Sequence, residues 1–381
     1  LQNTMAKSGG DFYNGVATTS LRFNDSDDAN LKFDPSGTGN QKTWTCSAWI
    51  KKTNNGNNTD SGNDRYVFNT FTAGNNANCA VMGFRSDKPF YSTYGVEVLV
   101  ATQVCRDTSA WYNIQWVLDT TQATAANRLK IYLNGVQITS FSVDNRSNAY
   151  LNQNNDLAIN NGNEVRVGDA GASGSRQNMA GYLADVNFID GLALTPSSFG
   201  ELKNGVWIPK DTSGLTFGTN GFRLKFDQVG VGTASTSTIG ADTSGNTNHF
   251  TSTNIVAADC AQPDSPENNF CTLNSIANLN FGSNHAAVHS EGNVKAVNSG
   301  TNVSHLYGTF RVNDFLTDGC YFEAKVTAID TSRFYFGIID PNSWTGAAVA
   351  SYQNSQKAVM NQANSVYSND NVAGYVTFTP D

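Results

Sequence analysis

Carboxylates are the side chains that could make this chain a glycan-cleaving enzyme, but their spacing does not suggest a catalytic pair. Glycosidases that retain the anomeric configuration hold two carboxyl groups about 5–5.5 Å apart, one as the nucleophile and one as the acid. The chain has only six glutamates, and no two of them lie within ten residues of each other. Two distant aspartates could still form a pair, although no motif points to one, so we expect a protein that is not an enzyme. The glutamates are Glu97, Glu164, Glu201, Glu267, Glu291 and Glu323.

Two groups of oxygen ligands could bind calcium. Asp25, Asp27 and Asp28 form a local acidic cluster, but Ca²⁺ takes about six to eight oxygens and this run supplies only a few of them. A tight turn, in which the aspartates cap backbone amides, explains the same residues and is the favoured interpretation. Asp169 and Asn178 lie in a polar, glycine-rich loop, which is either an alternative calcium or ligand position or a solvated loop. We expect no cofactor, with Ca²⁺ left open.

Two histidines give a weaker hint of a metal site. His285 and His289 are four residues apart, so that on a helix the two imidazoles would share one face. Glycine and asparagine bracket this segment and no third ligand is near, which disfavours metal binding. Neither the nucleophile motif G-x-S-x-G nor the phosphate-binding motif G-x-x-x-x-G-K-[ST] occurs in the sequence.

A tyrosine-rich stretch is the best candidate for sugar recognition. Tyr91 and Tyr94 lie in PFYSTYG, close to Asp87 and ahead of an apolar strand. In a polar loop, tyrosines can stack on a sugar ring while neighbouring groups form hydrogen bonds with its hydroxyls. The same stretch could equally be a hairpin turn or a contact between subunits.

The composition fits an all-β protein and disfavours several classes of function. Of 381 residues, 34 are glycine and only 15% are charged, while Asn, Ser and Thr are abundant and favour turns over helices. The hydrophobic fraction of 39% is ample for packed cores. A net charge of −8 without a Lys/Arg cluster disfavours nucleic acid as a partner. No apolar run approaches about 20 residues, so we expect no membrane insertion.

The six cysteines have long, irregular spacings that fit neither a metal site nor a disulfide framework. We expect reduced, structural cysteines, with Cys46 buried because it alternates with Trp44 and Ala48. Cys260 and Cys271 flank a proline-containing loop and are the one pair that could be joined. Reduced thiols are compatible with assembly in a reducing cytoplasm.

Residues 111–139 predict two consecutive β-strands. Every second residue is apolar over 114–118 and again over 129–133, and the second run stops at Asn-Gly. A period of two places each apolar set on one face of a pleated strand, and Asn-Gly is the strongest short signal of a hairpin turn. By the same alternation we expect a core that contains Trp44, Trp116 and Phe188.

Short strands separated by Asn/Gly loops are typical of a sandwich or jelly roll. We expect a connector over 1–17 and a first sandwich over 18–250, with strands mainly over 18–200 and a return strand near 221–227. A proline-bearing linker over 251–275 would follow, and then a second sandwich over 276–381 that is either reduced or continued beyond the sequence. The loops 52–64 and 169–178 are long, polar and rich in glycine.

Four stretches resemble laminin-G-like domains of the concanavalin A-like lectin/glucanase superfamily. Their opening segment is similar to SLRFNDSDDANLKF at 20–33, and their W-[YH]-x-[IV] strand with its Y-[LV]-N-G turn is similar to residues 111–139. Their closing strand resembles GYLADVNFIDG at 181–191, and a turn that usually precedes the sandwich resembles DTSGNTNH at 242–249. The resemblance implies a jelly-roll β-sandwich but says little about the ligand, because one fold hosts many functions.

The C-terminal part resembles the start of a SPRY-like sandwich, through YFEAKVTAID at 321–330 and RFYFGIID at 333–340. DTSAWY at 107–112 and DTTQAT at 119–124 resemble structural proteins of tailed bacteriophages. This resemblance implies a non-enzymatic virion protein, a tail fibre, tail spike or capsid fibre, that is assembled in the host cytoplasm. Its partners would be host-surface glycans and other virion proteins, in a homotrimer. A purely structural decoration or assembly protein is the alternative, and a glycan-degrading enzyme is a less favoured one.

Overall fold

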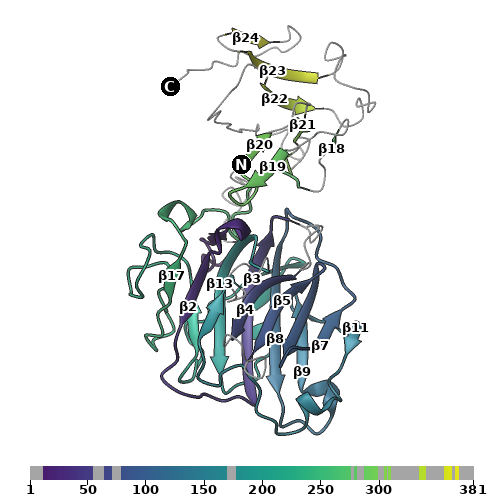
Figure 1. Cartoon of the computed structure of the whole chain (residues 1–381), viewed down its shortest axis with the longest axis vertical. Helices are drawn as coiled ribbons and strands as arrows, with labels where there is room; N and C mark the ends of the chain where they lie inside the picture. The colour runs from purple at the N-terminus through teal and green to yellow at the C-terminus, as the bar shows by residue number, and fades with distance from the viewer. Residues whose placement is uncertain are drawn as a thin grey trace. The chain divides into compact units, whose positions relative to one another are not determined.

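The computed structural model describes residues 12–54, 64–70, 79–169, 177–275, 279–280, 287–298, 304–306, 308–309, 334–339, 356–362 and 365–368. Within these ranges the chain is almost entirely β, and its helical residues are confined to single 3-10 turns. Two large antiparallel sheets lie face to face in the part that contains residues 12–275 (Figure 1). The predicted all-β, jelly-roll type of sandwich is therefore confirmed for this part of the chain. The described residues contain no helix that is long and apolar enough to span a membrane.

The first sheet, here called the β3 sheet, has the order β1-β13-β3-β8-β9-β10, and β16 also pairs with β13. Its two central strands, β3 and β13, are ten residues long and buried along almost their whole length, so the sheet is covered on both faces. The register between them shifts from Ala184 to Asn187, which marks a β-bulge in β13. The strands are β1 (Leu21–Phe23), β3 (Thr43–Lys52), β8 (Trp111–Asp119), β9 (Leu129–Leu133), β10 (Val136–Gln137), β13 (Gly181–Asp190) and β16 (Phe222–Leu224).

The second sheet, here called the β5 sheet, has the order β11-β7-β6-β5-β4-β12-β2-β17. Successive strands pair as antiparallel neighbours from β4 to β7, whereas β2, β12 and β17 are brought together from distant parts of the sequence. Its strands are β2 (Asn30–Phe33), β4 (Asp64–Thr70), β5 (Ala80–Arg85), β6 (Lys88–Thr93), β7 (Val96–Ala101), β11 (Phe141–Asp144), β12 (Val165–Val167) and β17 (Thr251–Thr253).

Aromatic side chains from both sheets meet in the core. Trp44, Trp116 and Phe188 are all buried, as their alternation predicts. Phe188 of the β3 sheet stacks on Phe68 of the β5 sheet with ring centroids 5.4 Å apart. The rings of Trp44 and Tyr91 also meet between the two sheets, tilted to each other and with centroids 5.9 Å apart. The sandwich is therefore held together by large apolar surfaces that face each other across its mid-plane.

The outer face of the β3 sheet is polar and is covered by later parts of the chain. The hairpin of β14 (Gly200–Lys203) and β15 (Val206–Pro209) covers one region, where the indole N–H of Trp207 donates to Asn113 Oδ1 at 3.0 Å. Residues 259–275 cover another, where the Lys51 ammonium reaches Asp264 at 2.7 Å. These polar groups form hydrogen bonds with one another, which compensates for their removal from water.

The segments expected to be a connector and a linker contact the sandwich directly. In the first, the side-chain amide of Asn14 donates to the backbone carbonyl of Pro209 in β15 at 2.8 Å, and the backbone amides of residues 15–17 donate to the carboxylate of Glu267 in the second segment. In the second, β17 extends the β5 sheet by pairing with β2. Both segments therefore add contacts to the first sandwich, although the predicted domain boundaries stay predictions.

A second compact unit contains Arg311–Asp381 and a few residues from elsewhere. Its described part is a three-stranded antiparallel sheet of β22 (Phe334–Ile339), β23 (Gln356–Gln362) and β24 (Ser365–Ser368). Two short pairs belong to the first unit, β18 (Leu279–Asn280) with β21 (Ser304–His305) and β19 (Ala287–Ser290) with β20 (Lys295–Asn298). Most of the predicted SPRY-like sandwich lies outside the described residues and stays a prediction.

The cysteines in the described residues carry free thiols, which confirms the expectation of reduced cysteines. Cys260 and Cys271 are both free, so the one suspected disulfide is not formed. Burial raises the pKa of Cys46, that of Cys105 to about 12 and that of Cys260 to about 11, so these thiols are weak nucleophiles. Cys320 lies outside the described residues.

Candidate functional site

Three connections of the sandwich leave from one end, which we call the Lys52 end. β3 finishes there at Lys52, which pairs with Gly181, the first residue of β13. β1 finishes at the same place, because Phe23 also pairs with Gly181. The β1–β2 turn, the residues that follow β3 and the residues that precede β13 therefore lie close together.

A cluster of polar side chains joins these connections. We call it the rim cluster: Asp25, Asp28, Asn54, Arg65 and Asn178. The amide of Asn178 donates to Asp28 Oδ1 at 2.6 Å and to the backbone carbonyl of Asp25 at 3.1 Å. Asn54 donates to Asp25 Oδ2 at 3.2 Å, and Arg65 Nε donates to Asn54 Oδ1 at 3.2 Å. The acidic turn is thus fixed by side chains from three other segments.

The conformation of the acidic turn leaves carboxylates facing solvent. Asp25–Asp27 form a 3-10 turn, and Asp28 adopts a left-handed conformation with φ 51°. Asp27 and Asp28 are exposed, whereas Arg65 and Asn178 beneath them are buried. Burial lowers the pKa of Arg65, and the charge of Asp25 opposes that shift. The cluster therefore presents acceptor oxygens on a fixed support and could bind the hydroxyl groups of a ligand.

Asp169 and Asp87 also lie at the Lys52 end, but both are buried. The carboxylate of Asp169 forms an ion pair with Arg166 Nη1 at 2.8 Å. That of Asp87 forms an ion pair with Lys52, and the backbone carbonyl of Asp87 accepts from the amide of Cys105 at 2.8 Å. Of the predicted ligand residues, Asp87, Asp169 and Asn178 are thus brought to one end, where their contacts are with the protein.

The tyrosine-rich stretch is a strand, whereas the sequence suggested a loop. Residues Lys88–Thr93 form β6 inside the β5 sheet. Tyr91 is fully buried against Trp44, so it cannot stack on a sugar. Tyr94 lies in the turn after β6, where its hydroxyl donates to the carbonyl of Asp156 at 2.9 Å. Asp87 and Tyr94 are at opposite ends of this strand, roughly 20 Å apart, so they do not form a joint site.

Metal ligands are not gathered in the part of the chain that the structure describes, where no group of three or more His, Cys, Asp or Glu could hold an ion. His289 lies in β19, a strand and not a helix, so the spacing of four residues does not place the two imidazoles on one helix face. His285 is outside the described residues. Asp25 and Asp28 share the rim cluster with the amide of Asn178. Calcium at this turn stays the open alternative to the tight turn that the sequence favours.

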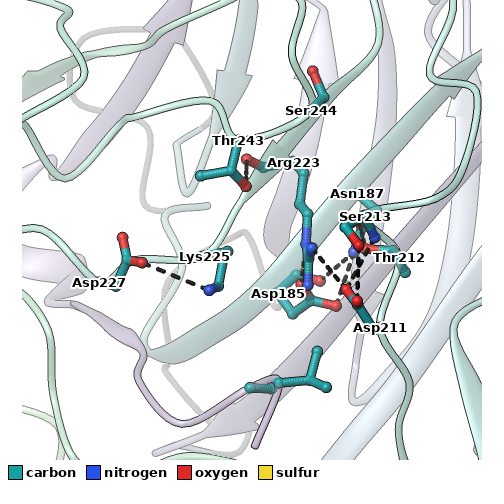
Figure 2. A network of polar contacts seen from close by, with 12 residues as sticks. Asp185, Asn187, Asp211, Thr212, Ser213, Arg223, Lys225, Asp227, Thr243 and Ser244 are labelled. Atoms are coloured by element: carbon teal, nitrogen blue, oxygen red, sulfur yellow. Dashed lines mark hydrogen bonds and ion pairs between the residues drawn. The ribbon is translucent and has the colours of Figure 1, made fainter.

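A second polar network lies on the outer face of the β3 sheet, at the bulge of β13 (Figure 2). Arg223 Nε on β16 donates to Asp185 Oδ1 at 3.1 Å, and Arg223 Nη1 donates to Asp211 Oδ1 at 3.2 Å. The other oxygen of Asp185 accepts from Asn187 at 3.0 Å, and Thr212 donates to Asn187 at 2.9 Å. Each of these groups is engaged by a neighbour, so the network joins β13, β16 and the segment that follows β15.

The buried ion pair of this network could not be foreseen from the sequence. Asp185 and Arg223 are 2% and 4% exposed, and Asp185 has a φ of 42° because it sits in the bulge. Burial raises the pKa of Asp185, while Arg223 and Asn187 oppose that shift. Access to solvent is too small for either residue to reach a substrate, so we regard the pair as structural.

No protein-family model matches this chain, and no curated protein matches it. Among solved structures, it is similar to a native heptameric SAP-like pentraxin from Limulus polyphemus, with 17% identity over 44% of this chain and 71% of that chain and a TM-score of 0.32. A putative carbohydrate binding protein from Bacteroides ovatus is 16% identical over 62% and 58% of the two chains, with a TM-score of 0.43. Mouse laminin α1 chain, domains LG4-5, is 9% identical over 59% and 53%, with a TM-score of 0.30. The chain thus spans less than two thirds of the last two proteins.

Proposed function

We propose that the protein is a non-enzymatic, lectin-like module that binds glycans at the Lys52 end of its sandwich. The observation that carries the proposal is the rim cluster, in which Asn178 holds the carboxylate of the exposed Asp28 at 2.6 Å, next to the exposed Asp27 in the same turn. Sugar hydroxyls donate to such oxygens, and acceptors that are already fixed lose little conformational freedom on binding. Loops on a rigid scaffold are a common place for such sites.

The setting of this module is a virion appendage, a tail fibre, tail spike or capsid fibre that attaches to a host cell. The support is the resemblance of DTSAWY and DTTQAT to phage structural proteins. Host-surface glycans and other virion proteins are the proposed partners, and Ca²⁺ is a candidate cofactor at the acidic turn. A homotrimer would present three sites, and multivalency raises the avidity of weak sites.

The surroundings of the glutamates support binding over catalysis. A general acid must be able to donate its proton to the leaving group of the substrate, whereas a carboxylate that is held by an ion pair or by hydrogen bonds within the chain is already engaged. Each glutamate in the described ranges contacts another residue of the chain. The pairs are Glu97 with Arg85, Glu164 with Arg166, Glu201 with Asn14, Glu267 with the amides of residues 15–17, and Glu291 with Arg22.

A glycan array probed with the full chain tests this proposal, with and without calcium. The double variant Asp27→Ala, Asp28→Ala should lose binding to the glycans that the unaltered chain retains. Asp156→Ala is the matched control, because it removes an exposed carboxylate near Tyr94 at the opposite end of the sandwich. Equal loss in both variants, or binding that neither variant changes, would count against the rim cluster as the site.

A purely structural role in the virion is the second candidate. It is favoured by exposed apolar side chains around Trp207: Val136 and Leu202 are each 70% exposed and Val206 is 47% exposed. Leu202 pairs with Trp207 across the β14–β15 hairpin, and Val136 follows Gly135, which lies against the same indole. This role predicts no glycan binding, together with loss of particle assembly on Leu202→Ser.

A further inference from the structure

Lys51 is a fully buried lysine at the end of β3, facing outward from the core of the sandwich. Its ammonium nitrogen lies 2.7 Å from Asp264 Oδ2 and 2.9 Å from the side-chain carbonyl oxygen of Asn269. It also donates to the backbone carbonyl of Phe270 at 2.8 Å. An amine, a carboxamide and a carboxylate therefore meet at one point, although the lysine is more than 200 residues away from the other two in the sequence.

The carboxamide of Asn269 is oriented with its oxygen toward the lysine. Its nitrogen Nδ2 donates to the backbone carbonyl of Ser109 at 2.8 Å, which fixes the oxygen on the side of Lys51. Because a C=O bond is about 1.23 Å long, the carbonyl carbon lies at most about 4 Å from the amine. Reacting atoms in a near-attack conformation are about 3–3.5 Å apart, so the amine and the carbon must approach each other by up to about 1 Å.

Asp264 is placed to accept and return a proton. Its other oxygen accepts from the indole N–H of Trp111 at 3.0 Å and from the backbone amide of Phe270 at 3.3 Å, and the residue is 5% exposed. Burial lowers the pKa of Lys51, while Asp264 opposes that shift. A buried ion pair of this kind can rearrange to the neutral amine and carboxylic acid, and the neutral amine is the nucleophile.

We propose that Lys51 and Asn269 are joined by an intramolecular isopeptide bond that the folded chain forms by itself, with Asp264 as the acid–base group. Asp264 takes one proton from the ammonium of Lys51. The free electron pair of Nζ then forms a bond with Cγ of Asn269, and the Cγ–Nδ2 bond breaks with its electrons going to nitrogen. A proton from Nζ and the proton held by Asp264 pass to the leaving nitrogen, which departs as ammonium. The products are an amide and ammonium, so no oxidant, reductant or co-reactant is needed.

This bond would tie β3 to the segment that leads away from the sandwich. Without it, residues 264–270 are held to β3 by hydrogen bonds and one ion pair. With it, tension that arrives along the chain from later residues passes into a central strand through a covalent link. Such a link suits a protein that is exposed to mechanical load and to proteases.

Lys52 provides the matched control, because it is the neighbouring lysine and is 1% exposed. Its ammonium contacts the carboxylate of Asp87, the backbone carbonyl of Cys105 and the ring of Phe84. These contacts include a carboxylate but offer no side-chain amide to attack. Lys52→Arg should therefore leave the reaction at Lys51 intact.

Intact-mass spectrometry of the purified, incubated full chain tests the proposal. We expect a mass lower than that of the sequence by one ammonia, and a proteolytic peptide pair that contains residues 51 and 269 joined. Lys51→Arg, Asn269→Ala and Asp264→Asn should show their full sequence masses, whereas Lys52→Arg should show the same loss as the unaltered chain. Circular dichroism identifies any variant that does not fold, and the folded variants decide the result.

Two results would overturn the proposal. One is an unaltered, folded chain that keeps its full sequence mass after prolonged incubation. The other is a loss of ammonia without the linked peptide, since an Asn-Gly pair such as Asn134-Gly135 can also lose ammonia by closing a succinimide. In the second case the mass change would survive in Lys51→Arg.

Discussion

Trp116 is the residue whose replacement tests the sandwich most directly. Its fully buried side chain lies on β8 of the β3 sheet, and its indole N–H donates to the carbonyl of Phe90 on β6 of the β5 sheet at 2.9 Å. Trp44 on the adjacent strand is buried to the same degree, but its indole nitrogen has no hydrogen-bond partner among the described residues. The two tryptophans therefore form a matched pair that differs by one hydrogen bond between the sheets.

The size of each effect follows from what each substitution removes. Trp116→Ala should lower the free energy of unfolding by about 3–5 kcal/mol, because it deletes the whole ring and leaves a cavity in the core. Trp116→Phe and Trp44→Phe each leave a smaller cavity of similar kind. Only Trp116→Phe also removes the hydrogen bond to the carbonyl of Phe90, so it should be the more costly of the two by about 1 kcal/mol.

Denaturant unfolding of the full chain, followed by circular dichroism, measures these differences. Circular dichroism is preferred because the substitutions remove a fluorophore. Equal losses for Trp116→Phe and Trp44→Phe would show that the bond between the sheets contributes nothing measurable. A Trp116→Ala variant that melts within a degree of the unaltered chain would show that Trp116 is not packed between the sheets.

Arg223→Ala should lower the free energy of unfolding by about 3–5 kcal/mol, because it leaves the buried carboxylate of Asp185 without its partner. Asp211→Ala should cost less than about 1 kcal/mol, since Asp211 is exposed and its ion pair is screened by solvent; equal losses in the same unfolding assay would contradict the distinction. Hydrogen bonds lower the pKa of Asp211 in the folded protein below its value in the unfolded chain. Its contribution to the free energy of unfolding is therefore fully present above the unfolded pKa and is lost as the pH falls through the folded pKa. The difference between Asp211→Ala and the unaltered chain should therefore vanish in an acid unfolding series. Alkylation of the native protein at neutral pH, followed by peptide mass mapping, should label the half-buried Cys271 before Cys46, because burial shields the Cys46 thiol and raises its pKa. The reverse order would place Cys46 outside the core.

Alternation along the chain predicted the fold wherever a strand has one face in the core. It placed Trp44, Trp116 and Phe188 inside, because a period of two assigns every side chain of a strand to a face once one side chain is placed. The Asn-Gly signal was equally reliable. Asn134 and Gly135 have φ of 48° and 79°, which is the conformation that a two-residue hairpin turn requires.

The candidate ligand residues were harder to predict, because their burial depends on segments far away in the sequence. Tyr91 stands among serine, threonine and proline, so its stretch looks like a loop until the neighbouring strands cover it. Two consecutive lysines at the end of a strand, as at Lys51 and Lys52, are typical of an exposed strand end. In the folded chain, Asp264 pairs with Lys51 and Asp87 pairs with Lys52, and the segments that carry these aspartates bury the two lysines. No local sequence pattern predicts these contacts. The bulge at Asp185 likewise arises from pairing with β3.

The contacts between the beginning and the end of the first sandwich determine when it can finish folding. The backbone amide of Ala17 donates to Glu267, which is 250 residues later in the sequence. At the other end of the sandwich's sequence range, β17 pairs with the outer edge of β2. At a synthesis rate of about 5–20 residues per second, the first strands wait on the order of 10–50 seconds for these partners. Until then β2 is an open sheet edge that can pair with another nascent chain. A chain shortened before Glu267 should therefore aggregate in place of folding into a smaller domain, and its synthesis should depend on chaperones more than its final stability suggests.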